Sequence, residues 1–438
     1  MRQTPPVAAK LQGSLALISH RTILKAMLWI ALFGGLQSGK YFFYNRMQEL
    51  SMGVTVILFF YTAYFAAQVK NSPVNWSFWF FGPMLGIALI TTVPAYLFST
   101  HNSVSMIPSV LANRAILNYL ISPCIVFLYA SGTSVLEIEN TIISVLKWSV
   151  IVYLCAYFTL PLPTYFVSDD PWKAGLVTFD YRGYRLKIPF KVMVISATLF
   201  MHKLGTDKAN RGTWLIFSGL VILSLNLYTS RSLNAGIVIS AVFYFFLLKN
   251  KRRAPIFMML LPLIILGQAY GIISFFEHLA IENAAGNDVR YDSYKKALGI
   301  IEKYPLLGMG MASAATITDA KLIWKYFFAD DIGIVGIAYR YGIVGASTYM
   351  IFAIKLISNQ ISLHWKYTAL NMQNSSVQIA LLCTMISAVL NMILNVDFIN
   401  PDGVMFASLI ISMNVIHGQH ISIQKSMRVA RSHSLVDK

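Results

Sequence analysis

The sequence predicts an all-α polytopic membrane protein with about twelve transmembrane helices. Of its 438 residues, 56% are hydrophobic and only 12% are charged, and the mean hydropathy is +0.60. A soluble protein of this length needs more polar side chains to cover its surface. Apolar runs of about 20 residues recur along the whole chain, and each is long enough to cross a bilayer. We therefore treat residues 1–438 as a single integral membrane domain.

The apolar runs give the expected spans in order. Most of them last about 17–23 residues, which matches the thickness of the hydrocarbon core of a bilayer. An even number of spans returns the chain to the side of the membrane on which it began. The runs start near Ile23, Ser51, Ser77, Leu111, Thr141, Ile188, Gly212, Leu233, Ala254, Gly333, Val377 and Gly403.

Short basic loops set the orientation, because lysine and arginine are concentrated on the cytoplasmic side of membrane proteins. The strongest cluster is Lys249–Arg253, and a second lies at Lys203–Arg211. With an even number of spans, both clusters and both basic tails fall on one side. We therefore expect cytoplasmic N- and C-termini, and two long external loops over residues 161–187 and 277–331.

The second external loop contains an amphipathic helix. Tyr294, Ala297, Leu298 and Ile301 recur with the i, i+3, i+4, i+7 spacing of one helical face. Pro305 disfavours helix at the residue before it, so the helix should end there.

Arg290 lies four residues before Tyr294 and extends the apolar stripe of this helix. An arginine on a buried face needs a partner, because an unpaired buried charge is costly. It can pair with Asp292 or Glu302 and hold the loop together, or it can reach an anionic substrate. The sequence leaves both interpretations open.

Arg231 stands between two apolar runs, at the expected external interface. Arginines in this position commonly extend towards lipid headgroups. Ionisable residues within a membrane are, however, functional candidates by default, and we favour an anion-binding role for Arg231.

Asp330 and Asp331 stand where the chain re-enters the membrane after the second external loop. Aspartate is favoured at helix N-caps, but a capping carboxylate can also face a cavity and accept a proton. Arg340 follows about two and a half turns into the next span. It forms either a structural ion pair with an aspartate or part of a substrate site.

Several classes of function are excluded or disfavoured. The net charge of +17 is spread between apolar runs, and no basic patch with interleaved aromatics indicates nucleic acid. The three cysteines lie inside apolar runs with no metal-ligand spacing, and the histidines form no HExxH pattern. No P-loop or nucleotide fingerprint is present. We expect no nucleic-acid partner, no metal and no cofactor.

The C-terminal half of the chain combines its motifs in a distinctive order. Ser230–Arg231 heads a span, the external segment carries Arg290 and the sequence PLLGMG, and the acidic pair leads into GIVGIAYRYGIVGA. In this order the chain resembles the O-antigen ligase / O-antigen polymerase family of bacterial envelope glycosyltransferases. The resemblance covers about Thr229 to Ala346, together with the overall topology.

The resemblance implies a GT-C-like fold in the bacterial plasma (inner) membrane. It implies donors linked to undecaprenyl pyrophosphate, reaction at the outer face without nucleotide or metal, and a chain-length regulator and a flippase of the same pathway as partners. The family arginines of the span head and the external loop match Arg231 and Arg290. Ligases carry a histidine near the end of the external loop, whereas this chain reads FADD at Phe328–Asp331, which favours a polymerase.

We therefore expect an enzyme that polymerises lipid-linked repeat units, with arginines that bind the leaving pyrophosphate and a carboxylate that acts as base on the acceptor hydroxyl. The alternatives are a ligase that moves glycan to another acceptor, and a transporter or flippase, a class in which about twelve spans are also common. The assigned catalytic residues are Arg231, Arg290, Asp330 and Asp331, and the assigned substrate-binding residues are Arg340, Tyr294 and Lys296.

Overall fold

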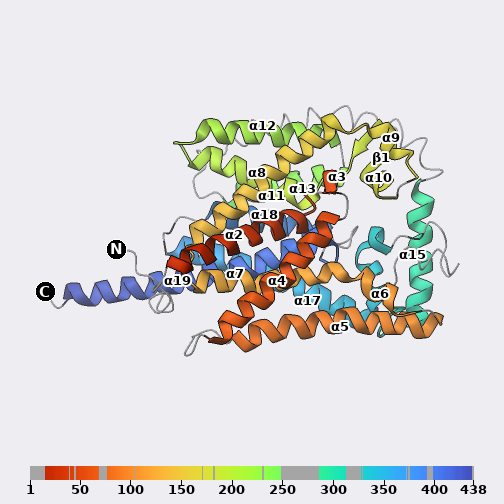
Figure 1. Ribbon diagram of the computed structural model, residues 1–438, viewed down its shortest axis with the longest axis horizontal. Helices are drawn as coiled ribbons and strands as arrows, with labels where there is room; N and C mark the ends of the chain where they lie inside the picture. The colour runs from red at the N-terminus through yellow and green to blue at the C-terminus, as the bar shows by residue number, and fades with distance from the viewer. Residues whose placement is uncertain are drawn as a thin grey trace.

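The computed structural model is an all-α bundle of long helices (Figure 1). It describes residues 15–38, 40–43, 46–68, 76–103, 105–169, 171–180, 183–228, 231–247, 286–311, 327, 329–370, 372, 375–391 and 398–436. The first part of the chain forms α2 (Leu15–Gly35), α3 (Lys40–Phe43), α4 (Arg46–Gln68), α5 (Trp76–Asn102), α6 (Ile107–Ala112), the 3₁₀-helix η1 (Arg114–Leu120), α7 (Ile121–Ala130) and α8 (Val135–Thr159).

The rest of the chain adds a small folded segment and further long helices. These elements are α9 (Leu162–Phe166), α10 (Pro171–Leu176), β1 (Val177–Asp180), β2 (Gly183–Leu186), α11 (Phe190–Thr206), α12 (Arg211–Tyr228), α13 (Arg231–Leu247), α15 (Gly286–Lys303), η3 (Ala329–Ile332), α17 (Gly333–Ala369), α18 (Ser376–Asn391) and α19 (Pro401–Val436).

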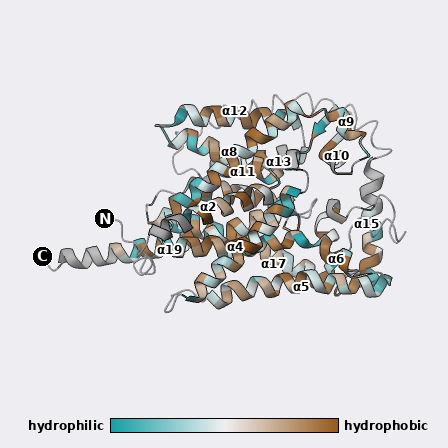
Figure 2. Ribbon diagram, in the orientation of Figure 1, coloured by the Kyte–Doolittle hydropathy of each residue, from teal (hydrophilic) through white to brown (hydrophobic). Residues whose placement is uncertain are grey.

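The predicted fold class, an all-α polytopic membrane protein, is confirmed. Every predicted apolar run falls on a helix, except the run near Ala254, which lies outside the described residues. Six helices in the described part of the chain are long and apolar enough to cross a membrane, and η1–α7 and α18 are shorter apolar helices. The total of about twelve spans stays a prediction. Figure 2 shows hydrophobic residues along the lengths of the helices.

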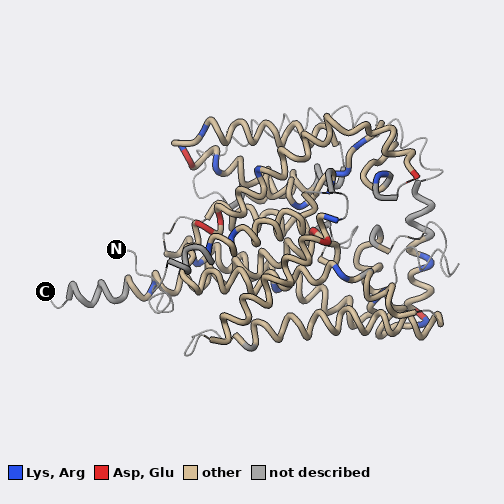
Figure 3. Tube along the Cα trace, in the orientation of Figure 1, with Lys and Arg blue, Asp and Glu red and all other residues tan. Residues whose placement is uncertain are grey.

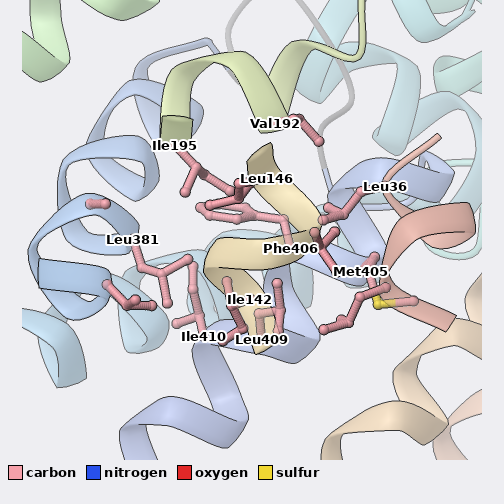
Figure 4. Close-up of a cluster of buried hydrophobic side chains, with 14 of the residues drawn as sticks. Leu36, Ile142, Leu146, Val192, Ile195, Leu381, Met405, Phe406, Leu409 and Ile410 are labelled. Atoms are coloured by element: carbon pink, nitrogen blue, oxygen red, sulfur yellow. The ribbon is translucent and has the colours of Figure 1, made fainter. Parts of the chain in front are cut away.

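The core lies where α2, α8, α11, α18 and α19 meet. Figure 4 shows Phe406 of α19 packed near Leu146 of α8 and Val192 of α11. Close helix approach is stabilised by buried serines that donate to carbonyl oxygens of neighbouring helices, as Ser51 does to Ala31 (2.6 Å) and Ser408 does to Asn118 (3.2 Å). Such contacts are typical of helix packing in membranes, where small residues let backbones come close.

The bundle has two distinct ends (Figure 1). We call the end that carries α9, α10, β1, β2 and α15 the loop end. The opposite end, where α2 begins and α19 finishes, is called the termini end, and the basic loop Lys203–Arg211 also lies there. Both described ends of the chain therefore lie at one end of the bundle, and the even number of spans stays a prediction. The other basic cluster, Lys249–Arg253, lies outside the described residues.

The connection over residues 161–187 is folded. It contains α9, α10 and an antiparallel hairpin of β1 and β2, in which Val177 pairs with Leu186. The patterns of the sequence did not predict these strands. The hairpin is attached to the bundle because the Tyr153 hydroxyl donates to the Leu186 carbonyl (3.4 Å) and the Tyr41 hydroxyl donates to the Lys187 carbonyl (2.8 Å).

Candidate functional site

The segment predicted to be external contains α15, which lies across the loop end, roughly perpendicular to the long helices (Figure 1). The amphipathic helix predicted from the sequence is therefore present. Ala297 is fully buried and Tyr294 is partly buried, against Ala329 and Ile332 of η3 and Tyr339 of α17. This contact joins α15, η3 and the start of α17 into one packed unit.

One residue of the predicted apolar stripe is placed differently. Leu298 is 51% exposed, and Ile300 packs in its place beside Ile301. The physical reason is that Leu298 lies about 100° around the helix from Ala297, which points directly at η3 and α17. The stripe is therefore rotated by a fraction of a turn from the predicted one.

Most of the predicted catalytic residues occupy positions in this unit. Arg290 lies in the first turns of α15, and Asp330 and Asp331 form the middle of η3. Their side chains lie outside the described part of the structure. Lys296 lies on the exposed face of α15, away from the buried contact that Tyr294 makes.

The motif PLLGMG is inserted into a break in α17. At Gly342 the helix has φ 65° and ψ −172°, so its hydrogen bonding is interrupted. In an unbroken helix, the amides of Ile343 and Val344 would donate to the carbonyls of Tyr339 and Arg340. They donate instead to the carbonyls of Pro305 (2.8 Å) and Leu306 (3.3 Å).

The inserted loop in turn donates hydrogen bonds to the carbonyls that the break in α17 leaves free. The amide of Met309 donates to the freed carbonyl of Tyr339 (2.8 Å), and the amide of Gly310 donates to that of Arg340 (3.0 Å). A further bond runs from the Met311 amide to the carbonyl of Pro94 in α5 (3.2 Å). Non-helical backbone at membrane depth needs such internal partners, because lipid offers none. We call this arrangement the backbone exchange.

Three glycines make the backbone exchange sterically possible. Gly308, Gly310 and Gly342 all have positive φ, a conformation that other residues rarely adopt. A Cβ on Gly342 would lie 2.1 Å from the Leu306 oxygen, and one on Gly310 would lie 2.3 Å from the Pro94 oxygen. The glycines of PLLGMG and the glycine of YRYG in α17 are thus both needed for this contact between the loop and the helix, which we call the joint.

The joint lies well below the ends of the helices that surround it. Gly342 is nine residues into α17, roughly 13 Å along its axis, and Pro94 is eight residues before the end of α5, roughly 12 Å along it. The segment from Pro305 to Met311 therefore enters the bundle rather than lying over it.

Arg340 lies beside this joint and is 9% exposed. It lines a cavity of about 200 Å³ together with Met311 of the inserted loop. Polar side chains from other helices complete the wall: Gln48 of α4, Asn113 and Arg114 at the start of η1, and Asn400 just before α19. Sequence reasoning identified Arg340 but missed the partners that α4, η1 and α19 bring to it.

A second group of cations lies at the same end. Lys191 of α11 is 1% exposed, and Arg185 of β2 is 7% exposed and donates to the Tyr228 carbonyl (3.0 Å). Arg231, the first residue of α13, follows Tyr228 by three residues. Its side chain is not described. Figure 3 shows Lys and Arg positions on the elements around this end.

Lys40 of α3 belongs to this group as well. Burial lowers the pKa of Lys40 to about 8, although attraction by Asp402 opposes this shift and repulsion by Lys187 adds to it. Sequence reasoning missed Lys40 and Lys191. The available signal was an ionisable residue at the edge of an apolar run, which marks a functional candidate.

The predicted residues therefore fall into two sets. Tyr294 and Arg340 belong to the unit of α15, η3 and α17, which also carries the backbone positions of Arg290, Asp330 and Asp331. Arg231 begins α13, which packs mainly against α11 and α18. Within the described residues, no group of three or more His, Cys, Asp or Glu side chains could hold a metal ion.

Comparison with known proteins finds a match that includes the candidate site. Residues 216–350, about a third of the chain, match the family model described as O-antigen ligase. The comparison with curated proteins gives no match. The matched segment includes α13, α15, η3 and the break in α17, and with them every residue assigned to the site from the sequence. The chain is thus similar to O-antigen ligases over residues 216–350, and this match supports the resemblance to the O-antigen ligase/polymerase family that its sequence motifs indicate.

Proposed function

We propose that this protein is a polysaccharide polymerase of the bacterial inner membrane, which joins oligosaccharide repeat units carried on undecaprenyl pyrophosphate. The family match supports membrane glycosyl transfer of the O-antigen ligase/polymerase type. The polymerase activity, the lipid carrier, the outer-face location and the partnership with a flippase and a chain-length regulator are our inferences from this match and from the loop end.

The observation that carries the proposal is the place of Arg340. The backbone exchange fixes the main chain on both sides of this arginine, and the side chain lines a cavity with polar walls. A cation held in place before the reaction stabilises developing negative charge more strongly than a mobile cation, because no reorganisation is needed at the moment of reaction. Such a site suits a reaction that releases a lipid-bound anion.

The reaction transfers a glycosyl group. An acceptor hydroxyl oxygen attacks the anomeric carbon of the donor, and the bond from that carbon to the pyrophosphate oxygen breaks. The pyrophosphate leaves with the bonding electrons on its lipid, and the hydroxyl proton passes to a carboxylate. In our proposal Arg231, Arg290 and Arg340 bind the pyrophosphate, Asp330 or Asp331 is the base, and Tyr294 and Lys296 contact the glycan.

A polymerase is favoured over a ligase by the end of the external segment. Ligases of the resembling family carry a histidine there, and this chain has Asp330 and Asp331 with no histidine in the preceding residues Lys321–Ala329. The carboxylates can take the proton that a histidine would otherwise accept.

The decisive experiment is a reaction of purified protein with a defined undecaprenyl-pyrophosphate oligosaccharide. We expect a ladder of products that differ by one repeat unit, formed equally well with and without a chelator. Arg231→Ala and Arg290→Ala should each lower the rate by about 10²-fold or more. Lys295→Ala is the matched control, because Lys295 lies on the exposed face of α15.

Other outcomes would point to the alternatives. Transfer of intact glycan to a second acceptor, without a ladder, would identify a ligase. Movement of lipid-linked glycan across a vesicle membrane without any new glycosidic bond would identify a flippase and refute the proposal.

A further inference from the structure

The cavity beside Arg340 is built partly from a region of the chain that the family match does not cover. Asn113 and Arg114 come from the start of η1, more than 100 residues before position 216. We infer that Asn113 and Arg114 form, with Arg340, a binding site for a phosphate-class oxyanion, and that its source is the pyrophosphate of the lipid carrier. This inference rests on the proposed function, which it extends to a second part of the protein.

Asn113 is the first observation. Its side chain is 2% exposed, and its Oδ1 accepts a bond from the Tyr341 hydroxyl (3.4 Å). Its Nδ2 donor is buried and has no partner among the described residues. A buried donor without a partner costs about 1–3 kcal/mol. Because Asn113 lines the cavity, a ligand acceptor placed there would remove this cost.

Arg114 is the second observation. Its Nη2 lies 3.5 Å from Glu49 Oε1, and its Nη1 donates to the Leu111 carbonyl (3.1 Å). Its Nε is buried and has no partner within the described part of the chain. Glu49 therefore competes for the Arg114 guanidinium, while the Nε donor stays available to a ligand.

The lining of the cavity defines the ligand. Two arginines line it, and no carboxylate does so among the described residues. The remaining polar groups are amides, from Gln48, Asn113 and Asn400, which can donate to an oxyanion. The volume of about 200 Å³ equals that of roughly six or seven water molecules. This is enough for a phosphate or diphosphate group, whereas a whole oligosaccharide would extend beyond it.

The test measures binding without catalysis. Purified full-length protein in detergent is incubated with radiolabelled inorganic pyrophosphate, and the bound fraction is measured. Asn113→Leu, which keeps the side-chain volume, should weaken binding about tenfold. Arg114→Gln should weaken it by a similar factor. Arg46→Gln is the matched control, because Arg46 is exposed at the start of α4 and does not line the cavity.

A third variant separates binding from a structural role. Glu49→Gln removes the negative charge that competes for Arg114, so it should tighten pyrophosphate binding several-fold. Weaker or unchanged binding in this variant would show that Glu49 and Arg114 only hold η1 against α4, and would count against the inference. Unchanged affinity in Asn113→Leu and Arg114→Gln, or an equal loss in Arg46→Gln, would overturn the inference.

Competition identifies the source of the oxyanion. Undecaprenyl pyrophosphate should displace the label at a concentration at least tenfold lower than phosphatidylglycerol does. The reverse order would assign the cavity to bilayer lipid and overturn the carrier assignment. The binding assay needs no glycosyl transfer. A protein that forms the product ladder but fails the binding test would therefore support the proposed function and refute only this inference. Binding without polymerisation refutes the proposed function alone.

Discussion

Charged side chains are paired differently at the two ends of the bundle. At the termini end, cations are matched by acceptors: Lys25 lies 3.3 Å from Glu137, and the Arg21 guanidinium donates to the Ser131 carbonyl (2.6 Å). Glu139 accepts from Ser375 and lies 3.4 Å from His417, whose other nitrogen contacts the Tyr367 hydroxyl (2.7 Å). These contacts join α8, α17, α18 and α19.

At the loop end, several lysines and arginines of the described residues lie close together. The cations Lys40, Arg114, Arg185, Lys191 and Arg340 gather around the starts of η1, α11 and α19; Glu49 lies beside Arg114, and Asp402 attracts Lys40. Burying a charge is costly unless it is compensated. The termini end therefore carries paired charges that stabilise the fold, and the loop end carries the cations to which we assign anion binding.

The largest effect should follow from Gly342→Ala. The new Cβ would lie 2.1 Å from the Leu306 oxygen, at a φ that disfavours any side chain. We expect polymer formation to fall more than 100-fold, because the clash separates the inserted loop from Arg340. Gly299→Ala on α15, where a Cβ meets open space, should leave polymer length and protein level unchanged. Equal behaviour of the two variants would show that the joint is dispensable.

Arg340→Ala should have the next largest effect. Removing a cation preorganised for the leaving group should lower the rate by about 10²-fold. Arg340→Lys keeps the charge but loses the planar fork, so it should recover only part of the rate. The measurement is the initial rate of glycosyl transfer at saturating donor. Full activity in Arg340→Ala would remove this residue from the proposed site.

His417→Ala tests the opposite end and should affect stability alone. The variant leaves the mostly buried Glu139 without its imidazole partner, which should cost about 1–3 kcal/mol. We expect a lower midpoint of thermal unfolding in detergent and an unchanged rate per folded molecule. A specific loss of activity at unchanged stability would contradict the assignment of the termini end to stability.

The smallest effect concerns Lys40 and pH. The pKa of Lys40 is lowered from 10.5 to about 8 by burial, so between these values the unfolded chain binds more protons than the folded one. Stability should therefore rise as the pH increases from about 8 towards 10.5. In Lys40→Met this part of the pH profile of thermal unfolding should become flatter. An identical profile in both proteins would show that Lys40 is not buried as described.

Much of the fold and part of the site could be predicted from local patterns. Long apolar runs require helices, since lipid offers no partners for an open backbone, and the amphipathic spacing around Ala297 located α15. Arg340 could be selected because an arginine inside an apolar run is costly without a role. Two features could not be predicted from local patterns: the rotation of the stripe at Leu298 and the hairpin of β1 and β2. Both depend on which neighbouring element each face contacts.

The sequence by itself determined the membrane class, the order of the helices, the position of the amphipathic helix and the family resemblance, because these follow from hydropathy and from motifs that are contiguous in the chain. Only the tertiary structure decided that PLLGMG enters the break at Gly342 and that Asn113 and Arg114 reach the cavity of Arg340. The reason is physical: a hydrogen bond between residues far apart in the chain depends on how the helices pack, and no local pattern specifies it.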